Sequence, residues 1–245
     1  MPEAFTIYLR QTILIFRKEL ASYFDSAVAY IALVVFLLIS GWFFSSSFFL
    51  INESDLRVLF SMIPIMYLFF IPAITMGLLA REKSAGTIEL LVTLPIADGA
   101  VVLGKYLAAM ALLGVALLFT LLHFITLVFV SSNVDVGALL SGYLGLLLVG
   151  GVYAAIGIFC SAITDNQITA FIGSFMLVFI LFVLSKVIIF VPGFMSAFVQ
   201  YISIDFHLTN ISRGVIDSRN LVYFGSMIFL FLTLAVRVLE MRKWR

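Results

Sequence analysis

The chain has 245 residues, of which 64% are hydrophobic and 11% charged, and its mean hydropathy is +1.23. Soluble domains typically have about 45–50% apolar and about 25% charged residues. Fourteen Lys and Arg with thirteen Asp and Glu cannot cover a water-soluble body of this size, which excludes a cytosolic enzyme and a secreted domain. The net charge of +1 argues against a nucleic-acid binder, and the single Cys160 excludes a disulfide framework and a Cys-rich metal site. We therefore predict an integral membrane protein.

The first predicted element, residues 1–25, is an amphipathic interfacial helix that lies on the inner leaflet and leads into the first span. Apolar residues recur at helical spacing on one face, and basic residues lie towards the other. The apolar residues are Phe5, Leu9, Ile13, Phe16, Leu20 and Phe24, and the basic ones are Arg10, Arg17 and Lys18. The sequence leaves open whether this helix is an electrostatic tether or packs beside a partner subunit.

Residues 26–245 are predicted to form one all-α transmembrane domain. A helix needs about 20 mostly apolar residues to cross the hydrocarbon layer, and six stretches meet this requirement. Each is too long for a β-barrel strand and lacks the alternating polarity of such a strand. The six stretches lie near residues 26–50, 58–80, 106–130, 138–163, 168–191 and 221–239.

The positions of Lys and Arg predict the orientation, because cytoplasmic loops are enriched in these residues. With six spans, the N-terminal arm, the loop 81–105 and the C-terminal end share one side, which holds ten of the fourteen cations. Both termini are therefore expected in the cytoplasm. The ten are Arg10, Arg17, Lys18, Arg81, Lys83, Lys105, Arg237, Arg242, Lys243 and Arg245, against Arg57, Arg213, Arg219 and an ambiguous Lys186.

The loop 81–105 begins with the sequence Arg81-Glu82-Lys83-Ser84-Ala85-Gly86-Thr87-Ile88-Glu89-Leu90-Leu91-Val92-Thr93-Leu94-Pro95. Gly86 allows a turn, and Thr87 is suited to cap a short helix. Glu89 would then lie in the first helical turn, where a carboxylate complements the helix dipole, and Pro95 would end the helix. This short cytoplasmic helix either docks into another protein or only closes the loop.

The run Phe70-Ile71-Pro72-Ala73-Ile74-Thr75-Met76, followed by Arg81–Leu91, resembles the signature of ABC-2-type transporter permeases. It is especially similar to the branch of the gliding-motility-associated permeases and of the nitrous-oxide-reductase maturation permease. The segment 205–217 before the last span resembles the family too, so the likeness covers nearly the whole chain. In that family the loop holds a coupling helix that docks into a separate ATP-binding subunit. The resemblance gives this role to Arg81, Glu82, Gly86, Thr87, Glu89, Leu90, Leu91 and Pro95.

The resemblance also implies partners. Two permease subunits, identical or different, would face each other in the bacterial cytoplasmic membrane, and each would receive one ATP-binding subunit. An accessory membrane protein with a large external domain often accompanies members of this branch. ATP and Mg would be bound by the partner, since no Gly-x-x-x-x-Gly-Lys-Ser/Thr sequence occurs here. We therefore expect no catalytic, cofactor-binding or metal-binding residue in this chain.

Residues 192–220 are predicted to lie outside the membrane, yet they remain apolar. Pro192-Gly193 breaks the fifth span, and the segment is expected to fold back into the outer leaflet as one or two short re-entrant helices. In the ABC-2 family such elements cap the external mouth of the pathway, and plain outer-leaflet packing is the alternative. Candidates for the pathway or outer gate are Lys186, His207 and Arg213, although Lys186 can also extend to the outer headgroups.

Three polar or small-residue features remain within the predicted spans and turns. His123 has Thr120 and Thr126 at i±3, so a neutral histidine sharing a hydrogen bond is favoured over a proton relay. Span four carries a small-residue surface that suits close packing within the subunit or between subunits. The turn 165–167 is either a plain turn or a partner contact. The small residues are Gly145, Gly150, Gly151, Gly157, Ala154, Ala155 and Ala162.

The leading hypothesis is the permease subunit of an ATP-driven ABC-2-type exporter, in which ATP hydrolysis by a separate subunit drives substrate translocation. A membrane scaffold that transmits ATPase-driven motion to extracytoplasmic machinery remains open. A secondary transporter is disfavoured because spans one to three show no repeat in spans four to six and midplane ion ligands are few. A membrane-embedded enzyme would need clustered His, Asp or Glu. The sequence does not identify the substrate, although an apolar pathway would suit an amphiphilic one.

Overall fold

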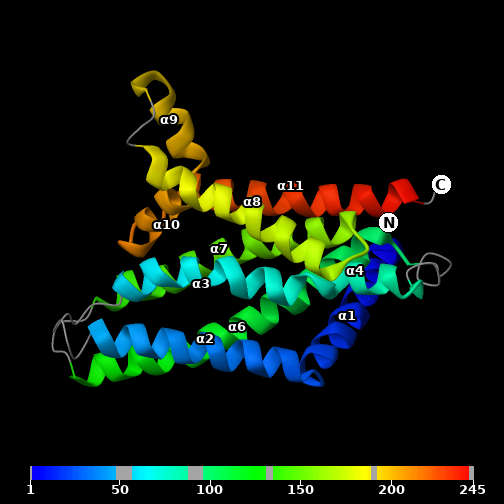
Figure 1. Ribbon diagram of the computed structural model, residues 1–245, viewed down its shortest axis with the longest axis horizontal. Helices are drawn as coiled ribbons and strands as arrows, with labels where there is room; N and C mark the ends of the chain where they lie inside the picture. The colour runs from blue at the N-terminus through cyan, green and yellow to red at the C-terminus, as the bar shows by residue number, and fades with distance from the viewer. Residues whose placement is uncertain (1, 48–56, 88–95, 131–134, 189–191, 243–245) are drawn as a thin grey trace.

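The structure is a computed structural model of the chain, and it describes residues 2–47, 57–87, 96–130, 135–188 and 192–242. All regular secondary structure in this described part is helical, as the sequence predicts (Figure 1). The helices are α1 (Pro2–Phe24), α2 (Ala27–Ser45), α3 (Arg57–Thr75), α4 (Gly77–Ser84), α6 (Asp98–Val130), α7 (Val136–Ile163), α8 (Gln167–Val187), α9 (Gly193–Ile202), α10 (Ile204–Ser212) and α11 (Ser218–Arg242).

The prediction of six spans is confirmed, because the described part contains six helical stretches long and apolar enough to cross a membrane. The second stretch, Leu59–Ser84, comprises α3 and α4 with an interruption at Met76. The third begins at Asp98 rather than near residue 106, so its first two turns belong to the segment that the sequence assigned to the loop. The six stretches are Ala27–Ser45, Leu59–Ser84, Asp98–Phe129, Val136–Ile163, Gln167–Val187 and Ser218–Met241.

The centre of the core is α7, which is buried along most of its length and packs against α3, α6, α8, α10 and α11 (Figure 1). Its glycines allow these close contacts, because side chains from neighbouring helices occupy the space of a Cβ. Leu113 and Tyr67 lie against Gly150, and Thr75 lies against Gly157. The small-residue surface of span four is therefore used for packing within the subunit.

The two ends of the helix bundle differ (Figure 1). Both chain termini lie at one end, together with α1 and α4, while α9 and α10 lie at the other, where α9 projects sideways from the bundle. We refer to the first as the terminal end and to the second as the α9–α10 end. This arrangement follows from six spans, since an even number returns the chain to the side on which it began.

Candidate functional site

The loop that the sequence assigns to partner coupling follows α4. The helix α4 begins at the interruption of the second span, where a side chain of another helix bonds to the backbone. Ser161 of α7 accepts hydrogen bonds from the backbone N–H groups of Leu79 and Ala80 at 3.0 and 2.9 Å, and it donates to the carbonyl of Met76 at 2.8 Å. Met76 makes no side-chain capping bond itself. The buried hydroxyl of Ser161 thus caps α4 from a different helix.

Replacing Ser161 by Ala is expected to destabilise the protein by about 1–3 kcal/mol, because two buried N–H groups lose their acceptor. Equilibrium unfolding in detergent micelles measures this loss. Ser84→Ala is the matched control, because the hydroxyl of Ser84 is exposed and serves only the carbonyl of Arg81. Equal stability of Ser161→Ala and Ser84→Ala would indicate that the second span closes its own hydrogen-bond ladder, contrary to the capping role.

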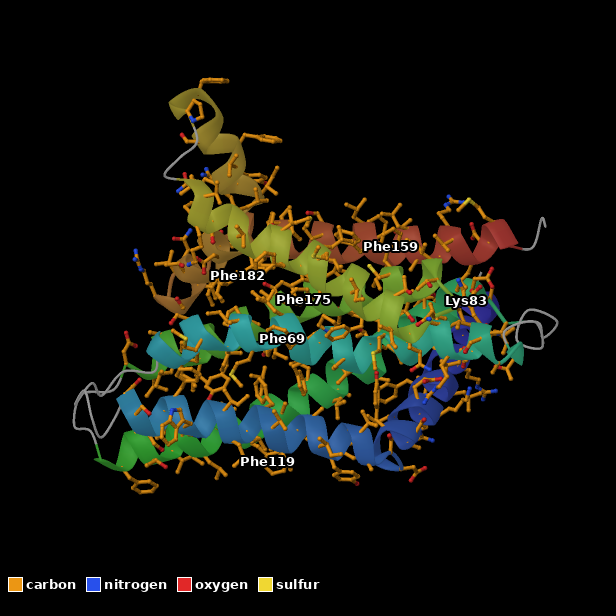
Figure 2. The ribbon with its side chains drawn as sticks, viewed as in Figure 1. Phe69, Lys83, Phe119, Phe159, Phe175 and Phe182 are labelled. Atoms are coloured by element: carbon orange, nitrogen blue, oxygen red, sulfur yellow. The ribbon has the colours of Figure 1, made fainter. Side chains whose placement is uncertain are left out.

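A second contact between α4 and α7 is made by Lys83, whose side chain is fully buried and points from α4 into the bundle (Figure 2). Its ammonium donates to the carbonyl of Ala162 and lies 4.0 Å from Asp165 Oδ1. A cation at this position complements the negative C-terminal end of α7. Ser161 and Lys83 therefore hold α4 firmly to the most buried helix of the bundle.

On its other side, α4 joins a buried ionic cluster made of Glu19, Glu82 and Lys105. Lys105 of α6 lies 2.9 Å from Glu19 Oε1 of α1 and 2.9 Å from Glu82 Oε1 of α4. The exposed fractions of these three side chains are 1% for Lys105, 6% for Glu19 and 15% for Glu82. We call this group the ionic cluster. It joins three helices that are far apart in the sequence through a single ammonium group.

The cluster carries two carboxylates and one buried cation, and Lys18 partly balances the second negative charge. Lys18 lies 3.3 Å from Glu82 Oε1 and 3.6 Å from Glu19 Oε1, but its own side chain is 65% exposed. Exposed ion pairs contribute little, because water screens them. The buried Lys105 therefore provides most of the compensation.

Two further hydrogen bonds attach α1 to the bundle. The hydroxyl of Tyr23 donates to the carbonyl of Ile74 at 2.6 Å, and the backbone N–H of Ala97 donates to Gln11 Oε1 at 3.2 Å. Burial, assisted by the charge of Glu19, raises the pKa of Tyr23 above its usual value, so the phenol stays protonated and remains a donor. Together with the ionic cluster, these bonds attach α1 to α3, α4 and the start of α6.

The structure describes part of the predicted coupling segment. Arg81 is exposed on α4, whereas Glu82 is turned inward to the ionic cluster. Gly86 adopts φ = 70°, a left-handed conformation that favours glycine, and the hydroxyl of Thr87 donates to the carbonyl of Glu82 at 3.1 Å. Glu89, Leu90, Leu91 and Pro95 lie outside the described residues, as do the N–H groups that Thr87 was predicted to cap.

At the α9–α10 end, the structure separates the three predicted gate residues. Lys186 of α8 is exposed and lies 2.9 Å from Asp205 Oδ2 of α10. Arg213, just after α10, is also exposed. Asp205 and Arg213 line one open pocket, which we call the outer pocket. Gln200 of α9 lines the same pocket. Lys186 and Arg213 are thus brought to the same region.

His207 lies instead in the interior, where α9, α10 and α11 meet. Its Nδ1 is 2.7 Å from Asn220 Oδ1 and its Nε2 is 2.9 Å from the carbonyl oxygen of Tyr201. The imidazole stacks on the ring of Tyr223 with the centroids 4.0 Å apart. These contacts give His207 a positioning role, since it fixes α10 against α9 and α11.

The histidine of the third span differs from the prediction in its hydrogen bonds. His123 Nδ1 lies 3.1 Å from the carbonyl oxygen of Thr120, and the ring contacts Phe44 edge-on. The hydroxyls of Thr120 and Thr126 bond to backbone carbonyls of their own helix, so they are not shared with His123. Among the described residues, no three His, Cys, Asp or Glu side chains gather closely enough to hold a metal ion.

An aromatic row lies where α8 meets α3. Phe171, Phe175 and Phe179 stack along α8 with centroid separations of 6.4 and 5.7 Å, and Phe69 of α3 lies 5.0 Å from Phe175 (Figure 2). Phe69 and Phe179 are exposed on the bundle surface. The sequence pattern did not indicate that these four phenylalanines from two spans form one continuous surface.

Comparison with known proteins agrees with this architecture. Residues 13–239 match the family model described as ABC-2 family transporter protein. No curated protein matches the chain. The matched range includes the C-terminal half of α1, the first five spans, the helices α9 and α10, and all but the last residues of the sixth span. Proteins of this family are membrane permease components of ABC transporters, which work with an ABC ATP-binding partner. The chain therefore belongs to the ABC-2 transporter family.

Proposed function

We propose that this chain is the permease subunit of an ATP-driven exporter, in which a separate ATP-binding subunit docks on the terminal end of the bundle. The observation that carries the proposal is the firm attachment of α4, which leads into the predicted coupling helix, to three other helices. Ser161 and Lys83 hold it to α7, and Glu82 holds it to α1 and α6 through Lys105. A displacement of the coupling segment would therefore be passed to the spans.

Within this function, the predicted coupling residues divide into two groups. Glu82 is a positioning residue, because its carboxylate lies in the ionic cluster rather than at the surface. Gly86 and Thr87 form the turn that redirects the chain. Glu89, Leu90 and Leu91 would contact the ATP-binding subunit. Pro95 would end the coupling helix, and Arg81 would lie at the edge of the contact. ATP would favour one state of the permease only if the docked subunit binds that state more tightly.

The aromatic row suggests which surface the cargo uses. α8 buries little of its length within the subunit and exposes Ile172 and Met176 beside that row. Two subunits facing each other across α3 and α8 would enclose an apolar path lined by phenylalanine. Such a path suits an amphiphilic cargo, because the apolar part would lie on the rings and the polar part would stay in water. Both termini would then lie in the cytoplasm of a bacterial cell.

The run Phe70–Met76 with Arg81–Leu91 supports a finer placement, in the branch of the gliding-motility-associated and nitrous-oxide-reductase maturation permeases. For this branch we propose a homo- or heterodimer of permease subunits with an accessory membrane protein that bears a large external domain. The alternative function, a scaffold that transmits ATPase-driven motion to external machinery, uses the same attachment of α4.

Affinity purification of the chain in detergent tests the proposal. We expect a P-loop ATPase at equal stoichiometry, and cargo uptake into inverted vesicles that requires ATP. Recovery of the ATPase without any ATP-dependent uptake would favour the scaffold. A chain that purifies alone and binds an ion would overturn both functions.

A further inference from the structure

The outer pocket has the chemistry of a binding site that the transport mechanism above does not use. It is open, has a volume of about 280 Å³ and lies between α8, α9 and α10. Polar groups converge on it from all three helices and from the residue that follows α10. Ser185 comes from α8, Gln200 from α9, Asp205 and Asn210 from α10, and Arg213 from the turn after it.

The pocket carries one uncompensated positive charge. Its single lining carboxylate, that of Asp205, is already paired with Lys186 at 2.9 Å. Arg213 is exposed and has no ion-pair partner in the part of the chain that the structure describes. A guanidinium group binds phosphate and carboxylate in a bidentate way and stays charged at any physiological pH. The pocket is therefore suited to an anion.

Ser203 provides an independent indication of a ligand. It lies between α9 and α10 and lines the pocket, and the residue is 1% exposed. Although Ser203 stands at the N-terminus of α10, its side chain makes no capping bond, and its hydroxyl finds no hydrogen-bond partner among the described residues. A buried hydroxyl without a partner is costly. A ligand oxygen in the pocket would satisfy it, next to the positive end of a helix dipole.

The other side of the pocket is apolar and continues along the bundle. Phe206 and Ile188 complete its wall, and Phe206 is 37% exposed. At helical spacing from Ser185 and Ile188, the same face of α8 carries Leu184, Leu181 and Leu177 towards the middle of the span. An amphiphile with its head in the pocket would place its acyl chain against these leucines.

We propose that the outer pocket binds the phosphate group of a phospholipid in the outer leaflet. Arg213 holds the phosphate oxygens, Ser203 donates its hydroxyl to one of them, and the acyl chains lie along α8. The proposal depends on which end of the bundle faces outward but does not depend on export, so the chain could bind this lipid even if it were a scaffold. A bound lipid would brace α9 and α10 against α8.

Native mass spectrometry of the full chain, purified with any subunit that accompanies it, tests the site by titration with phosphatidylglycerol. We expect Arg213→Gln to weaken lipid binding about tenfold and Ser203→Ala about threefold, as the loss of a charged and of a neutral hydrogen bond predicts. Arg219→Gln is the matched control, because Arg219 is exposed at the same end but does not line the pocket. Its affinity should stay within about twofold of the wild type.

Two further arms identify the ligand. Diacylglycerol with the same chains lacks the phosphate and should bind at least tenfold more weakly. Inorganic phosphate that competes with the lipid in an Arg213-dependent way would support a phosphate site open to free anions, and binding of the lipid alone would support the headgroup. The proposal is wrong if Arg213→Gln, with an unchanged thermal transition, binds phosphatidylglycerol and inorganic phosphate as the wild type does, or if diacylglycerol binds equally well.

Discussion

Replacing Lys105 by Met is expected to destabilise the protein by about 3–5 kcal/mol, because Glu19 and Glu82 would remain buried with no buried cation between them. The ammonium of Lys105 lies 2.9 Å from a carboxylate oxygen of each. Lys18 cannot replace it, since its exposed charge is screened by water and lies farther from both carboxylates. Equilibrium unfolding in mixed micelles measures the loss, and ATPase stimulation in the assembled complex should fall with it.

Two variants separate the buried charge from general damage to the fold. Lys18→Met removes a cation that lies beside the ionic cluster on its exposed side, so it should cost less than about 1 kcal/mol. The triple variant Glu19→Gln, Glu82→Gln and Lys105→Met removes all three buried charges and should regain much of the stability that Lys105→Met loses. If the triple variant were as unstable as the single one, loss of packing rather than uncompensated charge would be the cause.

The fold could be predicted from the sequence because its main signal is local. Each span is a run of apolar residues long enough for the bilayer, and no information from elsewhere in the chain is needed to recognise it. The interruption of the second span could not be predicted in this way. Its cause is the hydroxyl of Ser161, which lies 85 residues beyond the carbonyl of Met76 that it contacts. Such a pairing requires the packing of α7 against α4 to be known.

The ionic cluster was missed for a related physical reason. In the sequence, Lys105 is one of the cations that indicate the cytoplasmic side, and the periodicity of residues 1–25 indicates only an apolar face. In the structure, the face of α1 next to the apolar one, with Thr12 and Glu19, is buried against α6. One local signal was available. Glu19 directly follows the basic residues Arg17 and Lys18, and an acidic residue in a helix on an anionic membrane surface suggests a cationic partner.

The difference between a local sequence pattern and a contact with a distant residue also separates two of the predicted coupling residues. Glu82 and Glu89 look alike in the sequence, as two carboxylates in one charged loop. Because Glu82 is held by Lys105, it contributes to the attachment of α4, and its loss should lower stability as well as coupling. Glu89 follows the turn at Gly86 and has no such internal role in our proposal. Reversing its charge should therefore act on the partner contact alone.

The variant Glu89→Lys is accordingly expected to insert and fold as the wild type does but to abolish transport-stimulated ATPase activity. In our proposal Glu89 lies in the first turn of the coupling helix, where a carboxylate complements the helix dipole, and a lysine would oppose that dipole and reverse the charge at the docking contact. The stability of the purified chain should change by less than about 1 kcal/mol, because in our proposal Glu89 contacts only the ATP-binding subunit. ATPase stimulation by cargo in proteoliposomes is the measurement, alongside the stoichiometry of the copurified ATPase.

Glu240→Lys is the matched control, since Glu240 lies on α11, its side chain is 42% exposed, and among the described residues its ion-pair partner is the neighbouring Arg237 at 3.0 Å. It introduces the same charge reversal at the same end of the bundle, away from the coupling segment, and should retain stimulation. Loss of stimulation in both variants would point to a general effect of charge at the membrane surface. Retained stimulation in Glu89→Lys would remove the docking role from this helix. The attachment of α4 by Ser161, Lys83 and Glu82 would then stabilise the bundle without transmitting motion.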